Sequence, residues 1–171
     1  MSALTEAQVQ RYGRQVLLRE VGGRGQRRLL EAPFVVEGAG PAFDVAVAYL
    51  AASGSPVRLR RDAGGFLDGV ALADFAPDAG LEGPPAGWLG PLEALPRADA
   101  AWHRVALGPG VVVGLSAHAP APTDVAPAEA DDEPVTQGAL AALVAQRFVL
   151  GLETAMLVEL GARGGRWARR R

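Results

Sequence analysis

The sequence predicts a single α/β domain with a Rossmann-like parallel sheet, preceded by helices and followed by a C-terminal β-hairpin. Residues 34–61 read as strand, glycine turn, helix and strand, and such βαβ units close with a right-handed crossover into a parallel sheet. The chain has 171 residues, of which 49% are hydrophobic, which suffices for one domain with its own core. The longest apolar run, residues 139–160, is interrupted by polar and charged side chains, so it indicates a buried helix rather than a membrane span.

Two helices are expected before the first strand. Thr5-Glu6-Ala7-Gln8 has the form of a capping box, so a helix should begin there. Gly22-Gly23 is expected to end this helix, and residues 26–31 to form a short second one. Pro33 then introduces the apolar run of residues 34–36, which is the first expected strand.

The βαβ unit follows directly. Gly38 and Gly40 are expected to form a tight turn after the first strand, because glycine adopts backbone conformations that other residues avoid. Helical spacing of apolar residues predicts a helix over residues 45–52, with Gly54 as its stop. In residues 57–61 apolar side chains alternate with arginine, which predicts a strand with one covered and one solvated face.

The middle of the chain, residues 63–133, carries weaker signals. Residues 63–101 are rich in Gly, Pro and Ala, and only residues 71–75 suggest a short helical piece. Residues 105–115 are expected to form a further buried strand after the Gly108-Pro109-Gly110 turn. Residues 118–134, rich in Pro, Ala and acidic side chains, are expected to form a loop.

The last part, residues 134–171, is predicted to hold a helix and a hairpin. Residues 137–150 are strongly helical and almost wholly apolar, so this helix packs either in the domain's own core or on a partner. Two strands over residues 155–160 and 166–170, joined by a glycine-rich turn, indicate a terminal β-hairpin.

The residue types that are missing exclude several kinds of chemistry. The sequence contains no Cys, Lys, Asn or Ile. Without Cys there is no thiolate nucleophile, disulfide or thiolate zinc site, and without Lys there is no ammonium group to hold a phosphate. The net charge of −2 provides no global field that would attract nucleic acid. The N-terminus lacks the pattern of a signal peptide, which favours a cytoplasmic protein.

The remaining chemical candidates are weak when read from the sequence alone. His103 and His118 are the only histidines, and they have no partners at metal-ligand spacing, so no metal site is expected. Ser116 lies near His118 but lacks the strained turn of a nucleophile elbow. The arginine-rich tail, residues 163–171, fits a basic edge strand that discourages aggregation better than a nucleic-acid or lipid site.

The N-terminal third resembles the ThiF/MoeB/HesA family of adenylating enzymes, relatives of the ubiquitin-activating enzymes. Arg11-Tyr12-Gly13-Arg14-Gln15 matches the family's R-Y-x-R-Q, and its G-x-x-G-Q follows at residues 22–26. The resemblance covers residues 4–62, with a weaker match over residues 134–152. It implies the Rossmann-like adenylating-enzyme fold in a shortened form, because the segment between the two matches is much shorter than in the family.

The family binds ATP and magnesium and adenylates the C-terminal glycine of a small ubiquitin-like or sulfur-carrier protein. Its loop G-x-G-G-x-G is matched here by residues 38–43, which include Gly38 and Gly40. Pro41 removes an amide donor, and Phe43 puts a ring where backbone must approach phosphate. Asp44 can satisfy the helix amides that would otherwise hold an anion. The loop is therefore expected to be degenerate.

Other parts of the family's active site have no counterpart. The acidic residue that would hold the ribose meets Arg60 or Arg61, with Asp62 as the remaining candidate. The family's cationic phosphate contacts, its magnesium Asp and its thiol nucleophile are not found. We therefore expect a non-catalytic pseudoenzyme without ATP, magnesium or another cofactor. The alternatives are an active ATP-dependent adenylyltransferase acting on a ubiquitin-like carrier, or a purely structural assembly subunit.

One family feature is retained. In the family, the second Arg of R-Y-x-R-Q reaches across a dimer interface into the partner's ATP site, and here that position is Arg14, with Arg11 as its companion. The resemblance thus implies a homo- or heterodimer with a ThiF/MoeB-like subunit and an arginine donated in trans. Without the family context, Arg14 reads as an ordinary solvated arginine.

Overall fold

The computed structural model describes residues 3–60, 84–96, 101–120, 134–152, 155–160 and 166–168. The expected helical piece at residues 71–75, Asp62 and most of the acid-rich loop lie outside these residues. In chain order the elements are α1 (Glu6–Val16), α2 (Gly22–Leu30), β1 (Phe34–Val36), α3 (Pro41–Ala52), β2 (Val57–Leu59), β3 (Gly87–Pro91), the 3-10 turn η2 (Leu92–Ala94), β4 (His103–Gly108), β5 (Val111–Leu115), α5 (Pro134–Val149), β6 (Ala155–Glu159) and β7 (Arg166–Ala168).

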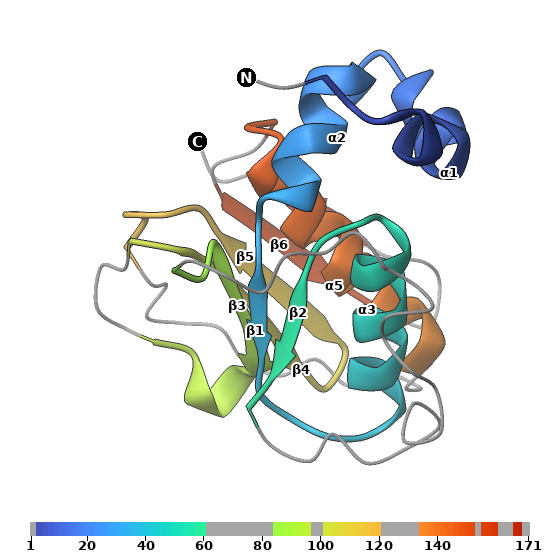
Figure 1. Cartoon of the computed structure of the whole chain (residues 1–171). Coiled ribbons are helices and arrows are strands. Elements are labelled where there is room, and N and C mark those ends of the chain that lie inside the picture. Colours follow the sequence, from blue (N-terminus) through green and yellow to red (C-terminus); the bar gives the residue numbers. More distant parts are fainter. Residues whose placement is uncertain are drawn as a thin grey trace.

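The predicted α/β class is confirmed, with one sheet in the order β2-β1-β3-β4-β5-β6-β7 across the described residues. The first four of these strands are parallel neighbours, as the βαβ unit predicts. The sheet is not parallel throughout, because β4, β5, β6 and β7 pair in antiparallel fashion. The result is a Rossmann-like parallel half extended by an antiparallel half (Figure 1).

The expectation of one strand over residues 105–115 was wrong, because two strands form there. β4 ends at Gly108, β5 begins at Val111, and the two pair in antiparallel register. Only Pro109 and Gly110 separate the strands, and Gly110 has a positive φ of 63°. A two-residue connection can reverse the chain but cannot carry it to a parallel neighbour, so the sheet turns antiparallel at this point.

The predicted capping box is present at the start of α1. The Thr5 hydroxyl accepts a hydrogen bond from the Gln8 amide at 3.2 Å, and the Gln8 side chain accepts one from the Thr5 amide at 3.0 Å. The end of α1 was misplaced, since the helix stops at Val16 and Gly22-Gly23 begins α2. Gly22 has a φ of 56°, so its left-handed backbone redirects the chain between the two helices.

Helix α3 begins at Pro41, four residues before the predicted start at residue 45. Gly40, with a φ of 105°, is the residue before the helix, and Pro41 occupies the first helical position. Proline is favoured there because its fixed φ suits a helix and the first amide has no helical acceptor. The apolar periodicity missed this first turn because the turn contains Pro41 and Asp44.

Helix α5 packs in the domain's own core, which decides between the two packing alternatives left open by the sequence. Together with α3 it covers one face of the sheet (Figure 1). The crossing of α3 and α5 is close at Gly138, where a Cβ would overlap the Ala42 carbonyl oxygen. Outward side chains remain at Val135 and Leu143, which are 60% and 41% exposed.

The C-terminal hairpin is confirmed, with Val158 of β6 opposite Trp167 of β7. The other face of the sheet carries a smaller cluster around Trp88, Ala106 and Val113. Among the described residues, none of the helices combines the length and the hydropathy needed to cross a membrane.

Candidate functional site

The sheet order defines one topological switch point, between β1 and β3. From β1 the chain passes through α3 to β2 on one side of β1, and then continues to β3 on the other side. In open α/β sheets, ligands bind outside the carboxyl ends of the two strands where the order reverses. The residues that follow β1 and those of β3 therefore form the candidate site.

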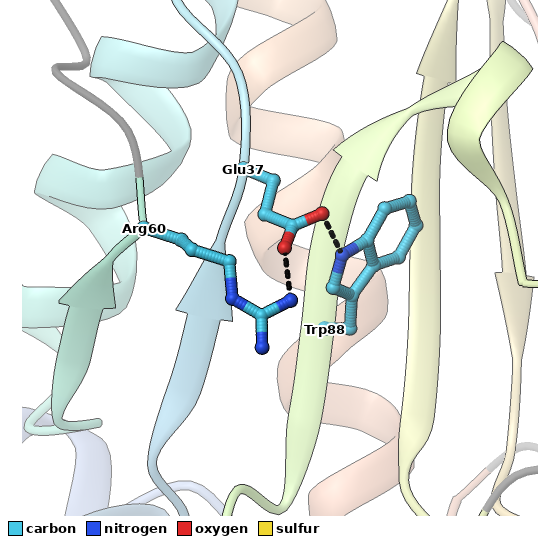
Figure 2. Close-up of polar contacts among 3 residues, drawn as sticks. All are labelled: Glu37, Arg60 and Trp88. Carbon is cyan, nitrogen blue, oxygen red and sulfur yellow. Dashed lines mark hydrogen bonds and ion pairs between the residues drawn. The ribbon is translucent and has the colours of Figure 1, made fainter.

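Glu37, the first residue after β1, lies at this switch point. Its amide donates a hydrogen bond to the Leu89 carbonyl of β3 at 2.8 Å. Its carboxylate accepts hydrogen bonds from Trp88 Nε1 at 3.0 Å and from the Arg60 guanidinium, with which it forms an ion pair (Figure 2). One carboxylate thus links three strands: β2 through Arg60, β1, and β3 through Trp88.

The Trp88 indole lies along β3 and covers the switch point on one face of the sheet. A Cβ built on Gly90 would overlap the indole ring, so this ring occupies the space that any larger residue at position 90 would need. Trp88 is only 6% exposed. The ring therefore fills the space over β3 on this face of the sheet.

An aromatic ring also covers the loop between β1 and α3. Gly38 and Gly40 have positive φ values of 140° and 105°. A Cβ at Gly38 would lie 2.7 Å from the Phe43 ring, so this ring packs directly on the glycine backbone. Phe43 also packs against the main core cluster. The ring occupies the surface of the loop over which a phosphate would have to approach the backbone.

Two further loop residues lie in the first turn of α3. Pro41 leaves this turn one amide donor short of the set that holds an anion at a helix N-terminus. Asp44 is buried, with 1% of its surface exposed. A carboxylate in the first turn is favoured by the helix dipole, and it opposes a second negative charge at the same place.

Arg60 directly follows β2, where an acidic residue would hold a ribose in a dinucleotide site. Its side chain is 68% exposed and pairs with Glu37. Glu37 and Trp88 were not identified from the sequence. An acidic residue immediately before Gly38 was a visible signal, but its partners come from strands far away in the sequence.

Arg14 and Arg11 lie on α1, at the opposite end of the sheet from the residue 37–40 loop (Figure 1). Tyr12, which is 1% exposed, anchors this helix against Gly54 at the end of α3. Arg11 lies with its guanidinium 5.9 Å from the Tyr12 ring centroid. Arg14 is exposed on the last turn of α1. The two arginines therefore do not lie near the residue 37–40 loop of the same chain.

The two histidines lie in different surroundings. His103 begins β4, stacks on Phe148, and has its pKa lowered from 6.5 by burial. His118 is exposed in the turn after β5, with a φ of 64°. Ser116 lies in the same turn, where its carbonyl accepts from the Ala119 amide. Within the described residues, no group of three or more His, Cys, Asp or Glu side chains could hold a metal ion.

Comparison with known proteins adds evidence on the fold. No family model and no curated protein matches the chain. The chain is similar to the crystal structure of SeMet PaaA, with a TM-score of 0.63 and 13% sequence identity, over 99% of this chain and 75% of that one. At this identity the similarity shows a shared fold alone.

Proposed function

We propose that this protein is a non-catalytic subunit of the ThiF/MoeB type, which pairs with an active homologue and donates Arg14 to it. The observation that carries the proposal is that side chains of the protein itself occupy the switch point. The Phe43 ring packs on Gly38, the Trp88 ring packs over Gly90, and Glu37 is engaged by Trp88 and Arg60. A nucleotide would have to displace these groups before it could approach the backbone.

The residue types available at this edge support the same conclusion. Transfer of a nucleotidyl group needs positive charge and a metal ion to stabilise the transition state. The chain has no Lys, and the Arg60 guanidinium is paired with Glu37. The two acidic side chains placed at the loop, Glu37 and Asp44, oppose a triphosphate.

The position of Arg14 supports an action in trans. Its helix lies away from the chain's own loop (Figure 1), and its side chain is exposed. An arginine is always charged and presents a planar set of donors, which suits the stabilisation of phosphate charge in a partner's site. The partner in this proposal is a second ThiF/MoeB-like subunit in the cytoplasm, in a homo- or heterodimer that acts on a ubiquitin-like carrier.

Nucleotide binding by the isolated chain tests the first half of the proposal. Isothermal titration with ATP and magnesium is expected to give no binding heat for the unmodified chain. The Pro41→Gly/Phe43→Gly double variant should gain measurable affinity, because it restores an amide donor and uncovers Gly38. Tyr49→Ala removes an exposed ring from the same helix and serves as the control. Magnesium-dependent ATP binding by the unmodified chain would contradict the proposal and favour an active adenylyltransferase.

Activity of the assembled pair tests the second half. A full-length homologue should co-purify with this chain from the native organism. In that complex, Arg14→Ala is expected to lower ATP–pyrophosphate exchange at least tenfold, which corresponds to about 1.4 kcal/mol of transition-state stabilisation. Arg19→Ala removes another exposed arginine beyond the end of α1 and should leave exchange unchanged. Equal activity of the Arg14→Ala and Arg19→Ala complexes would reject the trans role and leave a structural subunit.

A further inference from the structure

The first two residues of β4 both hold the segment that leaves β5, residues 116–120. His103 Nδ1 accepts a hydrogen bond from the Ala117 amide at 3.1 Å. Arg104 donates to the Ala119 carbonyl and, at 2.9 Å, to the Pro96 carbonyl. Since neighbouring residues of a strand point to opposite faces, the segment is held at two points by side chains on the two sides of β4.

The His103 ring also packs against helix α5. It stacks on Phe148 of α5, with the ring centroids 5.8 Å apart and an angle of 15° between the planes. This contact orients the imidazole so that Nδ1 faces the Ala117 amide. The bond requires the neutral imidazole, because a protonated Nδ1 carries a hydrogen and becomes a donor.

We infer that His103 is a pH-sensitive latch, whose protonation releases residues 116–120 from β4 and thereby uncovers the buried guanidinium of Arg104. The protonated Nδ1 would place its hydrogen against the Ala117 hydrogen, so the two groups must separate. Ala119 lies two residues further along, and its carbonyl accepts a hydrogen bond from the guanidinium of Arg104, which is 0% exposed. Loss of the hydrogen bond between His103 and Ala117 therefore also weakens the contact between Arg104 and Ala119 on the other face of β4.

The elements packed against β4 carry few charged side chains. Of the elements that contact β4, the strands β3 and β5 carry no charged side chain, and α5 carries Arg147. Arg104 is the next residue of β4, and His118 lies on the released segment. Glu93 of η2 is the single carboxylate on these elements, and it is exposed to solvent.

The direction of the pH dependence follows from burial, which lowers the pKa of His103 below 6.5. The closed state therefore holds the neutral ring, and the latch contributes its full stability above pH 6.5. This contribution is lost as the pH falls through the lowered pKa of the closed state. The segment should be closed at neutral pH and should open in mildly acidic solution.

Amide NMR of the full chain between pH 7.5 and 5 tests the inference directly at Ala117. The protection factor of the Ala117 amide, corrected for the intrinsic pH dependence of exchange, is expected to fall at least tenfold below pH 6.5. His103→Asn should remove this dependence, because the Asn side-chain oxygen accepts a hydrogen bond at both pH values. His118→Asn is the matched control, since Asn tolerates the positive φ of this position and His103 is untouched.

Three results would overturn the latch. The first is a flat protection profile at Ala117 in the unmodified chain. The second is a pH dependence of Ala117 protection that persists in His103→Asn or disappears in His118→Asn. The third is an equal loss of protection in α3 and at Ala117, which would indicate global unfolding. Loss confined to residues 116–120 and absent from His103→Asn supports the inference.

Discussion

Trp88→Ala should lower the free energy of unfolding by about 3–5 kcal/mol, the range typical of a buried Trp or Phe replaced by Ala. The indole is 6% exposed and packs in the cluster on the second face of the sheet, so its removal leaves a cavity that the strands cannot close. The substitution also removes the hydrogen-bond donor that the indole supplies to Glu37. Denaturant unfolding followed by circular dichroism measures the change.

Two further variants separate the packing of Trp88 from its hydrogen bond. Trp88→Phe keeps most of the apolar ring but has no N–H, so it should cost about 1.5–3 kcal/mol, the range for a hydrogen bond to a charged group. Trp102→Ala removes a Trp that is 37% exposed and should cost distinctly less than Trp88→Ala. Equal losses for Trp88→Ala and Trp102→Ala would show that Trp88 does not anchor the switch point.

Gly138→Ala should destabilise the protein by about 2 kcal/mol, although alanine is the better helix former. The added Cβ would overlap the Ala42 carbonyl oxygen of α3 and lie 2.8 Å from Val45 Cβ. Because Ala42 contributes backbone, the two helices must move apart, and such overpacking costs about 1–3 kcal/mol. The gain in helix propensity, up to about 1 kcal/mol, does not offset the whole of a clash with backbone.

Gly13→Ala is the matched control for this prediction. Gly13 lies within α1, and a Cβ there meets nothing within 4 Å. The same substitution should therefore stabilise the protein by up to about 1 kcal/mol, through helix propensity alone. Thermal unfolding of both variants should give melting temperatures that move in opposite directions. A stabilised Gly138→Ala variant would contradict the close crossing of α3 and α5.

Local patterns predicted much of the parallel half of the fold. The capping box at Thr5, the apolar run of residues 34–36 and the glycines at positions 38 and 40 each specify a local conformation with little help from distant residues. The predictions were wrong where one sequence pattern is compatible with two conformations. Gly22-Gly23 can end one helix or begin the next, and an apolar run such as residues 105–115 can be one long strand or two short ones.

The candidate site was predicted only in part. Pro41 and Phe43 were expected to obstruct the loop, and the structure places the Phe43 ring on Gly38. Glu37 and Trp88 were missed because their contact joins residues 51 positions apart in the sequence. No local pattern indicates that a carboxylate after one strand will meet an indole on another. The missing Lys and Cys, in contrast, limit the chemistry of the chain in any fold.

The sequence by itself therefore determined the α/β class, the βαβ unit, the terminal hairpin and the chemistry that the missing residue types exclude. Each of these depends on composition or on neighbours within one element. The tertiary structure decided the antiparallel half of the sheet, the burial of α5 and the contacts of Glu37 at the switch point. These features depend on which strands become neighbours, and strand order is fixed by packing of the whole core rather than by any single segment.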